Sequence, residues 1–180
     1  MEWRKSCARL DWATPDWLYD LLDAEFGFDL DAAATVKQSK AALYFGPDHE
    51  LRDYRNALDR TWDDGRHEVK AIWLNPPYGK DVGVWVEKAY RESRREGVTV
   101  VVLVNSQTDT LWFRDYIQRA VEVRFCTGRV GFVDPDTGLP AHRSVNRSMI
   151  VVFTAGHEGP PRYSVVDYRP GVRQQLSILG

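Results

Sequence analysis

The sequence of 180 residues has little of what marks disulfide-rich, zinc-binding or membrane proteins. Its two cysteines, Cys7 and Cys126, lie far apart and have no CxxC or Cys/His pattern beside them. This argues against a disulfide framework or a zinc site and fits a reducing cytosol. The histidines show neither HxH nor HxxxH spacing, so we expect no metal site; they are His49, His67, His142 and His157.

Long apolar runs and an excess of one charge are also missing. The N-terminal stretch "MEWRKSCARLDWATP" has no apolar core of signal-peptide length, and no segment reaches the length of a membrane span. The sequence holds 24 basic and 26 acidic residues, a net charge of −2. This balance argues against a protein that coats nucleic acid by electrostatic attraction alone, although a local basic face is still compatible with it.

What the sequence does hold is a globular composition, with 43% apolar and 12% aromatic residues. No internal repeat, low-complexity segment or Pro/Gly/Ser linker divides it. The length fits one domain, so we expect residues 1–180 to form a single domain.

Helix and strand patterns alternate along most of the chain. The stretch "TPDWLYDLLDAEFG" predicts a helix over 14–27, which Thr14 can cap, Pro15 can begin and Gly27 can end. The segment 35–66 is the least legible, with a short strand in "AALYFG" and a helix or loop in "ELRDYRNALDRTW". The remaining pattern predicts helices at 82–95 and near 111–117, and strands at 28–31, 69–74, 98–104, 121–125 and 148–153.

This order predicts an α/β fold, a mainly parallel sheet with helices on both faces. The last two strands are expected to form a late antiparallel hairpin near one edge. The span from Asp31 to Asn75 is short for two full strand–helix units, which favours a sheet trimmed in this part. Ligands bind at the carboxyl ends of the strands in such sheets, and "FDLD" and "WLNPPY" put polar residues there.

The stretch "IWLNPPYG" runs from an apolar strand directly into two prolines. Such a sequence is good turn chemistry, and the motif can be purely structural. However, two prolines also fix the backbone and leave rigid carbonyls without N–H donors. The side chain of Asn75 and the carbonyl of Pro76 make two fixed acceptors suited to an exocyclic amino group, and Tyr78 offers a flat face for a base.

The motif resembles that of S-adenosylmethionine-dependent amino methyltransferases, in which Asn-Pro-Pro-Tyr follows a strand. The wider pattern is similar to the phage-type DNA N6-adenine methyltransferases and implies their Rossmann-like methyltransferase fold. The matching stretches run in the family's order over roughly residues 11–153; they are "DWATPDWLYDLLDAEFGFDLDAAAT", "NALDRTW", "IWLNPPYG", "VVVLVNSQTDTLWF", "RFCTGRVGF" and "SMIVVF".

The resemblance implies a role for each residue of the motif. Asn75 and the Pro76 carbonyl would accept hydrogen bonds from the adenine amino group, Tyr78 would stack on the extruded base, and Pro77 would keep the loop rigid. The adenine must leave the duplex because its amino nitrogen is otherwise paired. The chemistry requires no metal or general base in principle, because the methylsulfonium is a strong electrophile.

The resemblance also implies a site for the cofactor S-adenosylmethionine. Asp31 would pair with its ammonium group, Ala32 and Ala33 would let the backbone approach closely, and the "WATP" segment would line the same pocket. The expected cofactor residues are Trp12, Thr14, Pro15, Asp31, Ala32, Ala33 and Asn56. The alternatives are a helix-capping role for Asp31 and a turn-forming role for Asn56. The chain departs from the Gly-rich first motif common among methyltransferases, and the acidic residue for the ribose is not identifiable among Asp48, Glu50 and Asp53.

The expected partner is double-stranded DNA, yet the length leaves no room for a separate target-recognition domain. Arg124, Arg129, Arg143 and Arg147 cluster around the late hairpin, and the last three are the predicted phosphate contacts. Scattered, solvated arginines are the alternative. Monomer and homodimer both remain open, and the expected location is the cytoplasm of a bacterial or phage-infected cell.

Two other functions fit the same residues. The first keeps the chemistry and changes the substrate to cytosine N4, RNA guanine or protein glutamine. The second is a degenerate, non-catalytic DNA-binding module, favoured by the poor first motif.

Overall fold

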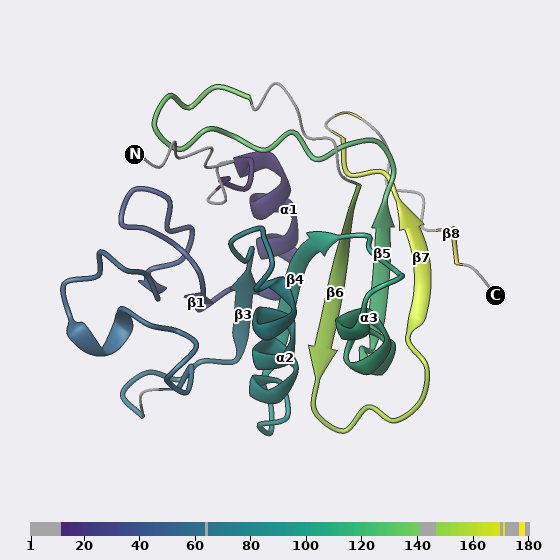
Figure 1. Cartoon of the computed structure of the whole chain (residues 1–180), viewed down its shortest axis with the longest axis horizontal. Coiled ribbons are helices and arrows are strands. Elements are labelled where there is room, and N and C mark those ends of the chain that lie inside the picture. The colour runs from purple at the N-terminus through teal and green to yellow at the C-terminus, as the bar shows by residue number, and fades with distance from the viewer. Residues whose placement is uncertain (1–11, 64, 141–146, 170, 172–176, 179–180) are drawn as a thin grey trace, which may run out of the picture.

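The computed structural model describes residues 12–63, 65–140, 147–169, 171 and 177–178. Their strands form one eight-stranded sheet in the order β2-β1-β3-β4-β6-β5-β7-β8 (Figure 1). The strands are β1 Leu30–Asp31, β2 Leu43–Tyr44, β3 Ala71–Leu74, β4 Thr99–Asn105, β5 Glu122–Cys126, β6 Ser148–Thr154, β7 Arg162–Val166 and β8 Ser177–Ile178.

Most neighbouring strands run parallel, and β6 is the main exception. Parallel pairs join β1 to β2 and β3, β3 to β4, and β5 to β7. β6 is antiparallel to β4 and to β5, between which it lies, and β8 is antiparallel to β7. The carboxyl ends of β1, β3, β4, β5 and β7 therefore meet at one edge of the sheet.

Helix α1, Asp16–Phe26, covers one face of the sheet. Its buried Leu18, Tyr19 and Leu22 pack in one apolar cluster with residues of β3, β4 and β6. The helix ends at Gly27, whose φ of 65° is a left-handed conformation and whose N–H bonds the carbonyl of Asp23.

The other face carries α2, Val82–Glu92, and α3, Leu111–Asp115, both in front of the sheet in Figure 1. Their inward side chains join the alternate residues of β3 and β4 in a second apolar cluster. Two 3-10 helices, η1 Arg52–Tyr54 and η2 Ile117–Arg119, also contribute to this cluster. The molecule thus has helix, sheet and helix layers.

A partly buried ion network ties α1 to the sheet. Arg124 of β5 donates to both carboxylate oxygens of Glu25 at 2.5 and 2.7 Å, and to Glu122 at 2.9 Å. The side chain of Arg124 is 9% exposed. Loss of Arg124 would remove the ion pair that joins α1 to β5 and one of the two arginine partners of the buried Glu122.

The predicted α/β fold is confirmed, including the short span before β3, where the described residues form only β2 and η1. The antiparallel pairing of the two late strands is also confirmed. The expected position near an edge is wrong, because β6 lies between β4 and β5, and β7 and β8 extend the sheet beyond them. Thr14 does not cap α1; Pro15 occupies the N-cap position and no side chain caps it.

Candidate active site

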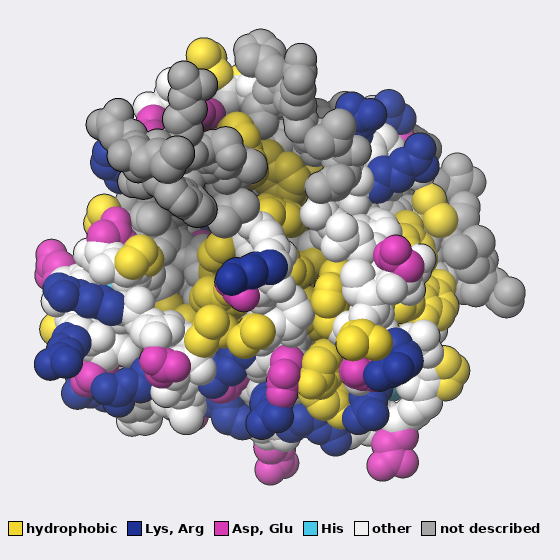
Figure 2. Space-filling model, in the orientation of Figure 1, with side chains coloured by type: hydrophobic (Ala, Val, Ile, Leu, Met, Phe, Trp, Pro, Cys, Tyr) yellow, Lys and Arg dark blue, Asp and Glu magenta, His cyan; other side chains and the backbone are white. Residues whose placement is uncertain are grey.

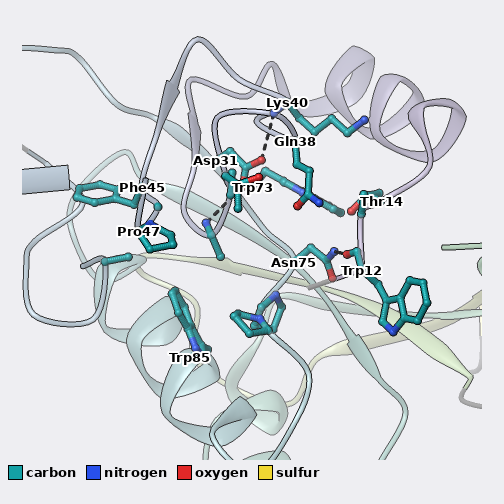
Figure 3. Close-up of a pocket in the computed structure, with 18 of the residues that line it drawn as sticks. Trp12, Thr14, Asp31, Gln38, Lys40, Phe45, Pro47, Trp73, Asn75 and Trp85 are labelled. Atoms are coloured by element: carbon teal, nitrogen blue, oxygen red, sulfur yellow. Dashed lines mark hydrogen bonds between the residues drawn. The ribbon is translucent and has the colours of Figure 1, made fainter. Parts of the chain in front are cut away.

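A cavity of about 210 Å³ opens at the carboxyl ends of β1 and β3. Five segments that are far apart in the sequence line the cavity, so only the folded sheet brings them together. They are residues 12–14, parts of 31–47, residues 55–57, parts of 73–77, and Trp85. Figure 3 shows Asp31 and Asn75 at this cavity. Asp31 is the last residue of β1, and Asn75 directly follows β3. The cavity therefore lies where ligands bind in open α/β sheets.

The amide of Asn75 is held in one orientation. Its Nδ2 donates to the main-chain carbonyl of Trp12 at 2.9 Å. Its Oδ1 is buried and has no hydrogen-bond partner among the described residues. A buried acceptor without a partner is costly, on the order of 1–3 kcal/mol. The arrangement leaves Oδ1 ready for a donor supplied from the cavity.

The carboxyl group of Asp31 is the buried acid of the cavity, 3% exposed. Its oxygens accept the backbone N–H of Ala33 at 3.3 Å and of Lys40 at 3.2 Å. Burial outweighs these bonds and raises the pKa of Asp31 to about 6. The ammonium of Lys40 pairs with Asp16, so the Asp31 carboxylate has no cation bonded to it among the described residues.

The residues after Asn75 divide between the cavity and the core. Pro76 and Pro77 both line the cavity. Tyr78 is not among the lining residues; its ring packs edge to face on Phe132 with centroids 5.4 Å apart. The Tyr78 hydroxyl is buried without a partner among the described residues, and burial raises its pKa.

Five of the seven predicted cofactor residues line the cavity; they are Trp12, Thr14, Asp31, Ala33 and Asn56. The other two, Pro15 and Ala32, are buried outside the lining. The amide of Asn56 forms a local turn, since it bonds Asp59 at 2.5 Å and the N–H of Leu58 at 3.2 Å.

The three acids considered for the ribose are not among the lining residues either. Asp48 accepts the backbone N–H of Val36 at 2.9 and 3.1 Å, and Asp53 pairs with Arg60 at 2.7 Å. Glu50 shares the same solvent-facing segment.

The sequence did not predict the apolar wall of the cavity. Phe45, Pro47 and Trp85 stand on one side of it, facing the polar Asp31, Gln38, Thr14 and Asn75 (Figure 3). Trp85 falls within the helix predicted at 82–95, and Phe45 lies in the least legible segment, 35–66. The signal that could have located Trp85 is its distance after Asn75, because a helix that follows a strand begins at the same edge of the sheet.

The predicted phosphate contacts lie beside a different hollow of the molecule. Arg129 and Arg147 are both exposed and line one cavity at the ends of β4, β5 and β7. Arg143 lies outside the described residues. Arg124 does not belong to this edge, because its guanidinium is buried between Glu25 and Glu122.

Comparison with known proteins assigns the chain to a family. The model of the family described as DNA N-6-adenine-methyltransferase (Dam) matches residues 4–175. The chain belongs to this family. It is similar to a protein named "DNA N-6-adenine-methyltransferase" from Haemophilus phage HP1 (strain HP1c1), with 30% identity over 145 residues, 79% of this chain and 77% of that relative.

Membership confirms the resemblance and the enzyme class drawn from the sequence: the chain is an adenine-N6-specific DNA methyltransferase. The alternative substrates and the non-catalytic module are not favoured. Within the described residues, no group of three His, Cys, Asp or Glu side chains could hold a metal ion. None of the described helices is long and apolar enough to cross a membrane.

Proposed function

We propose that the chain methylates the N6 atom of a flipped-out adenine in double-stranded DNA, with the amino group held at Asn75. The observation that carries this proposal is the buried Oδ1 of Asn75, which has no partner in the described structure although its Nδ2 is fixed by Trp12. An exocyclic amino group is a donor of the kind that this oxygen lacks. The carbonyl of Pro76, in the same cavity wall, is the second acceptor.

The cavity suits S-adenosylmethionine, which has an ammonium group at one end and a purine at the other. Asp31 supplies a buried carboxylate for the ammonium, and the wall of Phe45, Pro47 and Trp85 supplies apolar surface for the purine. Thr14 and Gln38 add hydrogen-bonding groups on the polar side. When bound, S-adenosylmethionine would supply an electrophilic methyl group to the amino nitrogen and leave as the neutral thioether, and the methylated nitrogen would lose one proton to solvent.

Two fixed acceptors act on the amino nitrogen in two ways. They orient its hydrogens toward Oδ1 of Asn75 and the Pro76 carbonyl, which turns the nitrogen lone pair away from them. They also stabilise the positive charge that develops on the nitrogen as it is methylated. Pro77 restricts the backbone that carries both groups, so little reorganisation is needed during the reaction.

Tyr78 remains the proposed stacking partner of the extruded adenine. Stacking on a base in the cavity would require its ring to leave the edge-to-face contact with Phe132. We further propose one catalytic domain without a separate recognition domain, acting in the cytoplasm of a bacterial or phage-infected cell. The single continuous sheet supports one domain, and the relative from a phage supports the location.

The test replaces Asn75 by alanine. Asn75→Ala removes one bond worth about 1 kcal/mol, but it also removes an unpartnered buried oxygen, so stability should change by no more than about 1 kcal/mol. The single-turnover rate should fall about 100- to 1,000-fold, as for other lost transition-state hydrogen bonds. Nucleoside mass spectrometry of treated DNA identifies the product, and calorimetry with S-adenosylmethionine separates binding from rate.

Asn105→Ala is the matched control. Asn105 ends the neighbouring strand β4, is half-buried and lies outside the cavity. Its variant should keep the parental rate. A folded Asn75→Ala protein that forms N6-methyladenine as fast as the parent would contradict the proposed role of the amide.

A further inference from the structure

A second cavity, of about 450 Å³, lies at the same edge of the sheet as the first. It is formed by the residue after β4, the end of β5 and the three residues that follow it, the residue before β6, and the end of β7. Phe125, Cys126 and Val165 give it an apolar floor, and Phe125 is supported from outside by a stacked contact with Tyr163 at 6.1 Å. Ser106 and Thr127 add hydroxyl groups.

Two arginines of this cavity, Arg129 and Arg147, carry uncompensated charge. Both are exposed, and neither forms an ion pair with any described residue. No carboxylate is among the described residues that line the cavity. Arg169, which lies beside Gly128 of the cavity, differs, because it is paired with Asp167 at 2.5 Å.

The surface view shows basic side chains at this end of the sheet. Lys and Arg side chains gather at the upper right of Figure 2, over the ends of β5 and β7, with few acidic groups between them. At the lower edge of the same view, acidic and basic side chains alternate. The positive charge at the end of β5 and β7 is therefore available to an anionic ligand.

We propose that this cavity is a second nucleotide site of the enzyme, which holds a DNA nucleotide that flanks the target adenine. This inference rests on the proposed function, since it needs the target base to enter the first cavity. Arg129 and Arg147 bind the phosphate, with hydrogen bonds available from Ser106 and Thr127. The apolar floor receives the deoxyribose or an edge of the base.

The sheet itself sets the distance between the two sites. Asn75 follows β3, and the second cavity is centred on β6 and β5, two to three strands away. At a strand spacing of about 4.8 Å, this corresponds to roughly 10–14 Å along the edge. One DNA strand advances about 3.4 Å per nucleotide along the helix axis, so the flanking nucleotide is roughly three or four positions from the adenine.

The first experiment measures the salt dependence of DNA binding without any methylation. The probe is a fluorescent duplex pool of random sequence, about three helical turns long, titrated with full-length protein at several salt concentrations. Arg129→Ala and Arg147→Ala should each lower the slope of log affinity against log salt by about 0.9. Arg94→Ala, an exposed arginine just beyond the end of α2, is the charge-matched control and should leave the slope unchanged. If the Arg129→Ala and Arg147→Ala proteins have the same salt slope as the Arg94→Ala protein, the proposal is wrong.

The second experiment locates the phosphate. A duplex that carries a methylation site mapped by sequencing is made with a single neutral methylphosphonate at each position in turn. For the parent, one position three or four nucleotides from the adenine should weaken binding most. In Arg147→Ala the same neutral linkage should not weaken DNA binding further, because the arginine that bound the charged phosphate has been removed. If the arginine substitution and the neutral linkage weaken DNA binding additively, Arg147 does not contact that phosphate.

Failure of this inference can be told from failure of the proposed function. The arginine variants should keep the parental affinity for S-adenosylmethionine and the parental rate at saturating DNA, while their half-saturating DNA concentration rises. If the parent binds DNA with the expected salt slopes but produces no N6-methyladenine, the second site stands and the proposed chemistry does not. If methylation is normal and the slopes are unaltered, the proposed chemistry stands and the second site does not.

Discussion

Replacing Asp31 by asparagine should stabilise the protein and weaken its cofactor site together. Burial raises the pKa of Asp31 from 3.8 to about 6. The folded protein therefore holds this proton more tightly than the unfolded chain does, and ionisation of Asp31 opposes folding as pH rises from about 4 to about 6. Above about pH 7 the full cost is present, roughly 3 kcal/mol.

An asparagine side chain is uncharged at every pH, so Asp31→Asn removes this cost. One of the two N–H groups, that of Ala33 or of Lys40, would then face the amide nitrogen and lose its acceptor, at a cost of about 1 kcal/mol. The net gain at pH 8 should be about 1–2 kcal/mol, or a rise of about 2–8 °C in melting temperature for a chain of this size. Near pH 4 the gain should disappear.

The affinity for S-adenosylmethionine should change in the opposite sense. If the carboxylate pairs with the ammonium group, the variant should bind about 10- to 100-fold more weakly at pH 8, the scale of a charge-assisted bond. The parental affinity should fall about tenfold for each pH decrease of one below 6, whereas that of the variant should be nearly flat. Melting curves and calorimetry at pH 4.5, 6 and 8 measure both quantities. A variant that melts lower than the parent at pH 8, or binds equally well, would refute the reasoning.

Two further substitutions probe the packing around the site. Gly46 lies in the cavity wall, and a Cβ atom there would sit 1.9 Å from the carbonyl oxygen of Ala34, so Gly46→Ala should destabilise the fold by about 2–4 kcal/mol in urea unfolding. Gly131→Ala, where a Cβ would meet nothing within 4 Å, is the control, and equal stability of the two variants would contradict the close approach. Tyr78→Phe removes a buried hydroxyl without a partner among the described residues and should raise stability by about 1 kcal/mol. A fall in melting temperature would mean that this hydroxyl has a bonding partner in solution.

The sequence predicted the parts of this fold that have strong local patterns. The helix before Gly27 and the continuous apolar run of β4 follow from spacing alone, and the structure has them within two or three residues of the expected bounds. The position of β6 could not be predicted, because apolar alternation shows that a strand exists but not which neighbours it pairs with. β7 begins after a Gly/Pro-rich turn and has only two buried residues, so its pattern was too weak to detect.

The candidate site shows the same division. Asn75 stood out because it directly follows an apolar strand, and Asp31 because it ends the first strand, where the resemblance places an acidic residue. The bond from Asn75 to the carbonyl of Trp12 could not be predicted, since it joins a side chain to a backbone atom 63 residues earlier. The contact of Tyr78 with Phe132 is likewise long-range, and the motif alone suggested a ring that faces the cavity.

The central position of β6 also bears on how the protein is synthesised. β6 lies between β4 and β5 in the sheet. A nascent chain that stops before residue 148 therefore leaves one hydrogen-bonding edge of the apolar strand β4 unpaired. Such an edge is prone to aggregate. The N-terminal segment is synthesised first, but Ala13 exchanges two backbone hydrogen bonds of 3.0 Å with Val133. These bonds can form only after residue 133 has been synthesised. Since this segment orients Asn75, the site that transfers the methyl group is among the last parts of the molecule to form.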